Sequence, residues 1–187
     1  DISHSHELEN TIRSMPEISD LSVRYLAPVQ IEANYRTRRD FDILPDTAGT
    51  QISGITLKDE VALSGLSDFV VEGEFLDESE SGYILLGANL LYRYSAGFGD
   101  FFATLDGVYP GDEVKVTVGD NTKTFIVKGI MDTKVDQVSL RAFVTKADFW
   151  RLVDRPLGNA NEFAMRIEPT SLVTADQVKQ NLVKAGF

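Results

Sequence analysis

Residues 21–35 read LSVRYLAPVQIEANY and alternate between apolar and polar side chains. The odd positions are Leu, Val, Tyr, Ala, Val, Ile, Ala and Tyr, while most even positions are Ser, Arg, Gln, Glu or Asn. A period of two over this length predicts a β-strand with one buried face and one face in water. Pro28 has no backbone N–H, so the stretch is either one long edge strand or two strands with a break between them.

The segments around this strand also carry helix and strand patterns. Residues 3–15 place Leu8, Ile12 and Met15 on one helical face, and Pro16 ends that helix. Short strands are expected at residues 52–55, 69–71, 138–144 and 163–167, and a short helix is expected at residues 57–66.

Turn and capping residues predict one hairpin and two helix starts. Residues 114–118 and 122–129 read as two strands joined by the turn Gly-Asp-Asn at residues 119–121. Thr145 and Thr174 occupy N-cap positions before helical stretches, and the second lies in a capping box.

The order of these elements indicates the fold class. Helix and strands come first, then a mostly β middle, then a strand and a helix, which favours an α+β fold over alternating βαβ units. Residues 60–80 hold seven acidic residues and no Lys or Arg, and residues 77–82 (DESESG) have linker composition. We expect residues 1–77 and 158–187 to form one discontinuous α+β module, into which a β-rich module, residues 78–157, is inserted.

The composition excludes several classes of protein. The chain has 187 residues with 18 basic and 29 acidic side chains, a net charge of −11. This charge argues against nucleic acid and anionic lipid surfaces as partners, because both need a positive face. No apolar run approaches the roughly 18 residues of a membrane-spanning helix, and there is no cysteine for disulfides or thiol chemistry. The sequence starts at Asp1 without a signal-like segment, so we expect a piece of a longer protein.

The sequence carries no recognisable catalytic, metal or cofactor motif. His4 and His6 are two residues apart in a predicted helix, where they point to different faces. The patterns G-x-S-x-G, S-x-x-K and G-x-x-x-x-G-K are all absent. We therefore predict that this chain is not an enzyme and binds neither cofactor nor metal. A hydrolase built from paired Asp or Glu side chains stays open as an alternative, because sequence spacing cannot test it.

Two clusters are candidates for a partner or substrate surface. They consist of Arg36, Arg38 and Arg39, and of Phe98, Phe101 and Phe102. Clustered arginines can grip an anion or an acidic partner, but they are also typical of a solvated strand edge guarded against aggregation. Clustered aromatic side chains mark a binding surface if they are exposed and part of the core if they are buried.

Several segments, taken in order, resemble the extracytoplasmic domain of MacB/FtsX-type ABC transporter permeases. They are residues 18–24 (ISDLSVR), 53–56 (SGIT), 66–76 (LSDFVVEGEFL), 84–91 (ILLGANLL), 105–114 (LDGVYPGDEV) and 125–130 (FIVKGI). Glycines 73, 87, 111 and 129 punctuate these segments where the backbone must turn or lie close to another chain segment.

The resemblance implies that the discontinuous module is a porter-like α+β subdomain and that residues 78–157 are its inserted β-rich subdomain. It implies a cell-membrane protein with this domain on the extracytoplasmic side, a second permease copy, and a cytoplasmic ATP-binding subunit reached through membrane helices. An extracytoplasmic adaptor or substrate is a further partner. The alternative is a free-standing extracellular ligand-binding or sensor module, which would need a well-formed apolar pocket with a few convergent polar groups.

Overall fold

The computed structural model describes residues 2–36, 38, 44–95, 103–154 and 159–187. The chain forms, in order, α1 (Ser5–Arg13), β1 (Ile18–Glu32), β2 (Thr47–Ile55), α2 (Leu57–Ser64), η1 (Leu66–Phe69), β3 (Val70–Gly73), β4 (Tyr83–Gly87), η2 (Ala88–Leu90), α3 (Tyr92–Ser95), β5 (Glu113–Val118), β6 (Asn121–Met131), α4 (Asp136–Ser139), β7 (Arg141–Thr145), α5 (Lys146–Val153), β8 (Glu162–Ile167) and α6 (Ala175–Lys184). The predicted α+β class is confirmed.

The larger part of the molecule is a closed barrel. Its strands follow one another as β1–β2–β7–β4–β6–β5, and β5 pairs with β1 to complete the ring. Strand β3 pairs with residues 129–131 of β6, beyond residues 121–126, which pair with β5. Because closure pairs every barrel strand on both sides, this part of the fold exposes few strand edges.

Strand β1 is too long to belong to the barrel alone. Residues 25–32 pair with β2, and residues 30–32 also pair with β5, whereas residues 18–24 leave the barrel and pair with β8. Pro28 lies in the stretch that pairs with neither β5 nor β8, so its missing N–H is tolerated within one continuous strand. Of the two predicted arrangements, the single strand is the one observed, but β1 is not an edge of the barrel throughout, because residues 30–32 pair with β2 and β5 at once.

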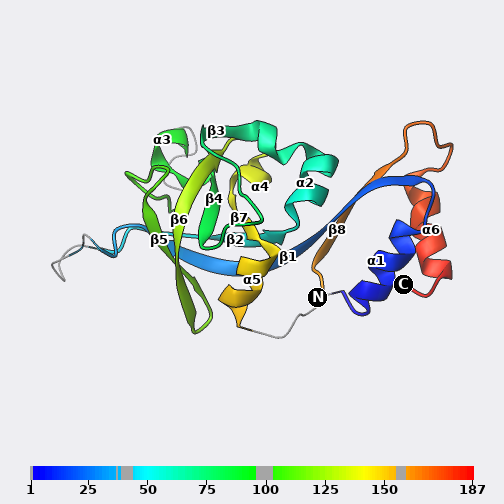
Figure 1. Cartoon of the computed structure of the whole chain (residues 1–187), viewed down its shortest axis with the longest axis horizontal. Helices are drawn as coiled ribbons and strands as arrows, with labels where there is room; N and C mark the ends of the chain where they lie inside the picture. The colour runs from blue at the N-terminus through cyan, green and yellow to red at the C-terminus, as the bar shows by residue number, and fades with distance from the viewer. Residues whose placement is uncertain (1, 37, 39–43, 96–102, 155–158) are drawn as a thin grey trace.

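A small lobe surrounds the first half of β1. It consists of α1, residues 18–24 of β1, β8 and α6, and it lies at one end of the molecule (Figure 1). Leu8 and Ile12 of α1 and Val178 of α6 are buried there. The labels of both chain ends lie at the lower right of Figure 1, toward this lobe. No helix in the described part of the chain is long and apolar enough to cross a membrane.

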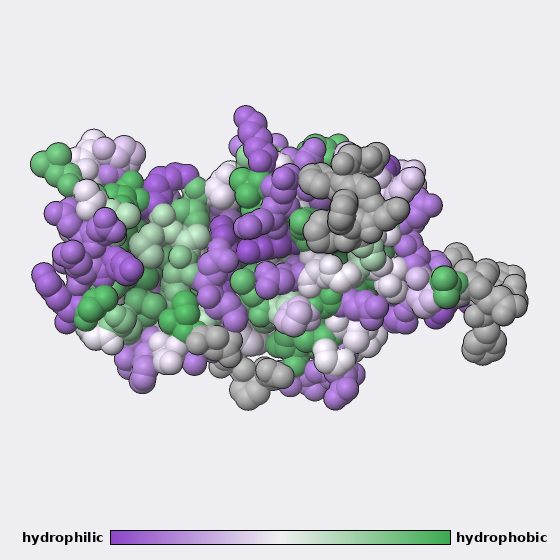
Figure 2. Space-filling model, turned by 180° about the vertical axis from the view of Figure 1, so that it is seen from behind, coloured by the Kyte–Doolittle hydropathy of each residue, from purple (hydrophilic) through white to green (hydrophobic). Residues whose placement is uncertain are grey.

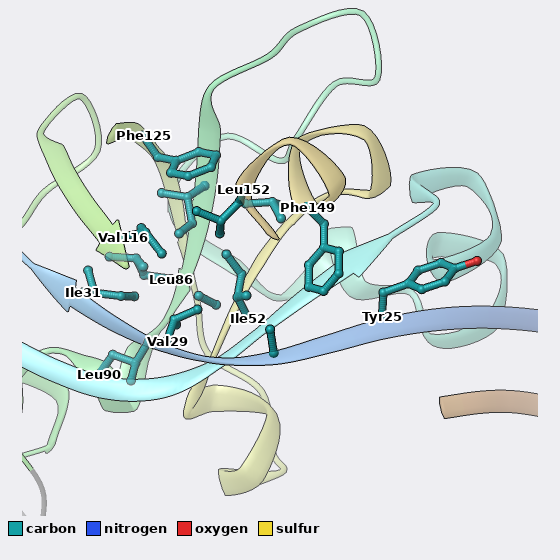
Figure 3. Packing of buried hydrophobic residues seen from close by; sticks show 14 of the residues in the cluster. Tyr25, Val29, Ile31, Ile52, Leu86, Leu90, Val116, Phe125, Phe149 and Leu152 are labelled. Carbon is teal, nitrogen blue, oxygen red and sulfur yellow. The ribbon is translucent and has the colours of Figure 1, made fainter. Parts of the chain in front are cut away.

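One apolar cluster runs from the barrel interior into the small lobe. Figure 3 shows Val29 and Ile31 of β1 gathered with Ile52, Leu86 and Val116 inside the barrel. All odd positions of β1 from 21 to 31 are buried, as the alternation predicts. Continuous packing along β1 therefore joins the two lobes into one apolar core.

The predicted helix caps are confirmed. The Thr145 hydroxyl accepts a hydrogen bond from the N–H of Asp148 at 3.2 Å. At the start of α6, the Thr174 hydroxyl accepts from the N–H of Gln177, whose side chain accepts from the N–H of Thr174. The hairpin is also found, with Val118 paired to Asn121 across a two-residue turn.

Two predicted strands differ from the structure. Residues 138–144 were expected to be extended, but α4 ends at Ser139 and β7 begins at Arg141. The backbone at this point lies against Gly87, where a Cβ would be 2.2 Å from the carbonyl oxygen of Ser139. Strand β3 begins at Val70, one residue later than expected, and the prediction that residues 69–71 form a buried strand is wrong at Val71, which is 50% exposed.

The predicted domain boundary at residues 77 and 78 is crossed by strand pairing. Strand β2, before the boundary, pairs with β7, and β3 pairs with β6. Residues 25–73 therefore share the barrel sheet with residues 83–145. The division into separately moving modules stays a prediction, and the observed change of partner along β1 falls at residue 24.

Candidate functional site at the junction of the two lobes

The two lobes meet where α2 lies against one face of the β1–β8 pair. Asp20 pairs with Arg166, Ser22 with Ala164, and Arg24 with Glu162. These residues share the face opposite the apolar one, which the sequence predicts to be in water. Instead Ser22 is fully buried and Arg24 is half-buried, because α2 packs over them.

Glu60 of α2 is the centre of this junction and is only 1% exposed. The Nε and Nη2 atoms of Arg24 donate to its two carboxylate oxygens at 2.9 and 2.8 Å. The hydroxyls of Ser22 and Ser64 donate to the same carboxylate at 2.7 and 2.8 Å. Each Glu60 oxygen thus accepts two hydrogen bonds, and the buried charge is compensated in the way that burial requires.

The ion pairs continue from α2 into the small lobe. Arg24 also contacts Glu162 of β8, and the second oxygen of Glu162 lies 3.4 Å from Arg141 of β7. Arg166 of β8 donates to the backbone carbonyl of Leu63 at the end of α2. Charged groups from β1, β7, β8 and α2 therefore meet at one place, which we call the junction cluster: Ser22, Arg24, Glu60, Ser64, Arg141 and Glu162.

The surroundings of Glu60 and Arg24 favour the ionised form of both side chains. Burial alone would raise the pKa of Glu60, but the hydrogen bonds and charge of Arg24, with the hydroxyls of Ser22 and Ser64, outweigh burial and hold that pKa below its usual value. Burial would likewise lower the pKa of Arg24, and Glu60 and Glu162 raise it instead. Because each oxygen of the Glu60 carboxylate already accepts two hydrogen bonds, this carboxylate is poorly placed to exchange a proton with a substrate.

Acid should weaken the junction. The pKa of Glu60 is lowered in the folded state, so its contribution to stability is present above the unfolded value of 4.5 and is lost as the pH falls through the folded value. We expect a carbon-detected NMR titration to show the Glu60 carboxyl changing protonation below pH 4.5. Unfolding measured between pH 7 and 3 should lose less stability in Glu60→Gln than in the wild type. A Glu60 titration at or above 4.5 would contradict this assignment.

A small cleft opens beside the junction cluster. Its volume is about 220 Å³. Its lining residues are Arg24, Glu60, Ser64, Leu66, Phe69, Thr133, Lys134, Val135, Val138, Arg141 and Phe143. The walls are mostly apolar, while the junction cluster forms the charged side.

Arg36 and Arg38 of the arginine cluster predicted from the sequence follow the end of β1 that is farther from the junction. Arg36 lies 2.8 Å from Glu113 of β5, and Arg38 lies 3.1 Å from Glu32, which also contacts Lys115. The positive charges described there are paired with acids of β1 and β5. Arg39 and the phenylalanine cluster Phe98, Phe101 and Phe102 lie outside the described residues, so their role as a partner surface stays a prediction.

A hydrolase built from acidic side chains needs two carboxyl groups close together in a cleft, and several carboxylates lie near Arg36. A groove of about 430 Å³ is lined by Asp106, Asp112 and Glu113 among others. Asp46 lies close by, and burial raises the pKa of its carboxyl group. The hydrogen bond from the backbone N–H of Asp106 lowers this pKa, whereas the negative charge of Asp106 raises it further. Within the described ranges, no group of three or more His, Cys, Asp or Glu is placed to hold a metal ion.

Sequence reasoning missed the junction cluster for a definite reason. Glu60 opens the acidic stretch 60–80, which has the composition of a solvated surface, yet several of its acids have cationic partners far along the chain. Glu72 pairs with Arg93, and Glu80 pairs with Lys128. The Glu60–Arg24 pair joins residues 36 positions apart, and neither alternation nor helical spacing reports such a contact.

Comparison with known proteins identifies the fold. No protein-family model matches the chain, and no curated protein sequence matches it. Among solved structures, the chain is similar to the periplasmic region of MacB from Actinobacillus actinomycetemcomitans, with a TM-score of 0.59 and 14% identity over 97% of this chain and 72% of that chain.

The chain is also similar to a second solved structure. The extracellular domain of the noncanonic ABC-type transporter YknZ from Gram-positive bacteria has a TM-score of 0.54 and 12% identity over 94% of this chain and 76% of that chain. The fold predicted from the resemblance, that of MacB-type transporter extracytoplasmic domains, is therefore confirmed.

Proposed function

We propose that this chain is the extracytoplasmic domain of an ABC transporter permease subunit. In this role it carries the conformational change driven by cytoplasmic ATP hydrolysis to the outside of the membrane. The observation that supports the proposal most is the likeness of nearly the whole chain to extracytoplasmic transporter domains. The junction cluster supports it further, because its donors and acceptors hold two lobes together and are not arranged for catalysis. The domain itself breaks no covalent bond and needs no cofactor.

The architecture suits mechanical transmission. Strand β1 passes unbroken from the small lobe into the barrel, so a displacement of α1 acts on the barrel through one backbone. A displacement of α6 acts through β8, which pairs with β1. The junction cluster adds a second connection between α2 and β8. Two discrete arrangements of such a junction are the physical requirement of a switch. The work done is the export of a peptide, drug or lipid, or the release of a lipoprotein.

The partners follow from this role. A second permease copy completes the transporter, and an ATP-binding subunit on the cytoplasmic side is connected through membrane helices. The arginine cluster and the phenylalanine cluster remain our candidates for contact with an extracytoplasmic adaptor or substrate. The alternative function is a free-standing ligand-binding or sensor module, which the cleft beside the junction cluster favours.

The location of the domain can be tested in the natural gene product. Asp120 lies at the exposed tip of the β5–β6 hairpin, and the chain has no cysteine of its own, so Asp120→Cys introduces one accessible thiol. We expect a membrane-impermeant maleimide to label this thiol in intact cells, and the labelled protein to sediment with membranes. The unsubstituted protein serves as the control. Labelling that appears only after lysis, or a labelled protein free of the membrane, would contradict the proposal.

A further inference from the structure

The cleft beside the junction cluster is built from two kinds of surface. One wall is apolar and combines Leu66 and Phe69 of η1, Val135 and Val138 of the 133–139 segment, and Phe143 of β7. Leu66 and Phe143 belong to a buried apolar cluster of their own, so this wall is firmly packed. Val135 is exposed at the rim, which leaves the apolar wall open to a ligand.

The other side of the cleft has more positive than negative charge. Arg24 is balanced by Glu60 and Glu162. Arg141 has a single ion pair within the described residues, the 3.4 Å contact with the shared Glu162. Lys134 lines the cleft, is exposed, and makes no ion pair or hydrogen bond in the part of the chain that the structure describes.

These charges make the cleft favourable for a negatively charged ligand. Three cations, Arg24, Arg141 and Lys134, line the cleft together with one carboxylate, Glu60. A second carboxylate, Glu162, does not line the cleft but pairs with both arginines. Asp132 and Asp136 flank Lys134 in the sequence but do not line the cleft. One positive charge is thus available at the mouth of an apolar cavity, and it would be paired by a ligand with one negative charge.

The volume limits the size of the ligand. Liquid water occupies about 30 Å³ per molecule, so 220 Å³ holds about seven non-hydrogen atoms. An unbranched alkyl chain of about six to eight carbons fills this space and leaves its head group at the mouth. A planar carboxylate there can accept two hydrogen bonds from the Arg141 guanidinium.

We propose that the cleft is a binding site for a small alkyl carboxylate, with the tail against Phe69, Val138 and Phe143 and the carboxylate between Arg141 and Lys134. The proposal stands apart from the transport role, since it follows from the cleft alone. Binding would have a structural consequence, because Arg141 would exchange its long contact with Glu162 of β8 for a shorter one with the ligand. The site therefore lies where occupancy can alter how the two lobes are held together.

Titration with octanoate, octanol and octylamine tests the head group. We expect octanoate to bind with a dissociation constant on the order of 0.1–1 mM, and the other two to bind at least about tenfold more weakly, because they lack the negative charge. Amide shifts in a nitrogen–proton NMR spectrum should fall on residues 64–69, 133–138 and 141–143. Equal binding of all three compounds, or shifts elsewhere on the protein, would overturn the proposal.

Substitutions test separately what the cationic residues and the apolar wall contribute to octanoate binding. Lys134→Gln and Arg141→Gln should each weaken octanoate binding about fivefold to tenfold, while Lys123→Gln, an exposed lysine outside the cleft, should leave it unchanged. Val135→Trp should block the rim and abolish binding without touching the core. Because Lys134 is exposed and unpaired among the described residues, its variant will fold. Unchanged affinity in both Lys134→Gln and Val135→Trp would also overturn the proposal.

Discussion

Replacing Glu60 with alanine should destabilise the protein by about 3–5 kcal/mol, which is what removal of one partner of a buried ion pair costs. The substitution leaves Arg24 half-buried with only Glu162 as a partner, and it removes the acceptor of the hydroxyls of Ser22 and Ser64. An unpaired donor in a buried place loses its hydration without compensation. Chemical denaturation followed by circular dichroism measures the change.

A matched control comes from another glutamate–arginine pair. Glu9 and Arg13 form an i,i+4 pair on the outside of α1 at 2.9 Å. Glu9→Ala should cost no more than about 0.5 kcal/mol, because water screens such pairs. Replacing both Arg24 and Glu60 with apolar residues of similar volume should cost less than Glu60→Ala alone. A Glu60→Ala protein as stable as Glu9→Ala would show that the junction cluster does not hold the lobes together.

Replacing Gly73 with alanine should cost about 3–5 kcal/mol, through two effects that add. Gly73 has a φ of +74°, where an L-residue is strained by about 1–2 kcal/mol. A Cβ there would also lie 2.2 Å from the carbonyl oxygen of Lys128 and 2.9 Å from the Cα of Gly129. These are backbone atoms of β6, so relieving the overlap means displacing β3 from the barrel.

Two other glycines separate the two effects. Gly119 also has a positive φ, of 55°, but open space surrounds the position of its Cβ, so Gly119→Ala should cost only about 1–2 kcal/mol. Gly49 has neither constraint, and Gly49→Ala should change stability by less than about 1 kcal/mol. Thermal or urea unfolding of the three variants measures the loss of stability in each and so ranks the three effects. Equal effects of Gly73→Ala and Gly119→Ala would show that the close approach of β3 to β6 does not limit the fold.

The glycines that carry the family resemblance have physical roles that the sequence partly indicates. Gly73 and Gly129 face one another across the β3–β6 pair, and Gly87 admits the carbonyl of Ser139. Gly111 has a φ of +96°, in keeping with the tight turn expected before β5. Such positions recur wherever the backbone must fold this way, so weak motifs spaced along the chain predicted the fold at low identity.

Closure of the barrel could not be predicted in the same way. The alternation of residues 21–35 correctly gives a strand and its buried face, because period and burial are local properties. Which strands lie beside β1 depends on residues 47–54, 115–117 and 162–167, far along the chain. The same limit hid the junction cluster, where the polar face of β1 is covered by α2 instead of water.

Figure 2, the molecule seen from behind, shows apolar residues on the surface of the small lobe as well as polar ones. In β8, Phe163 and Met165 are only partly buried against the shared core, and Val183 of α6 is 62% exposed. Exposed large apolar side chains also occur outside the small lobe, as at Val71, Tyr109 and Val135, so this exposure does not distinguish the two lobes.

If the proposed function is right, we expect the small lobe to change its position relative to the barrel as the transporter works. Spin labels at Asp120→Cys on the hairpin tip and Lys179→Cys on α6 would report that position, since both residues are exposed and the chain has no other cysteine. Pulsed electron resonance on the complete transporter measures the distance between them. We predict two different distance distributions, one without nucleotide and one with ATP trapped. Identical distributions in a transporter that still hydrolyses ATP and moves its cargo would show that the small lobe does not move relative to the barrel.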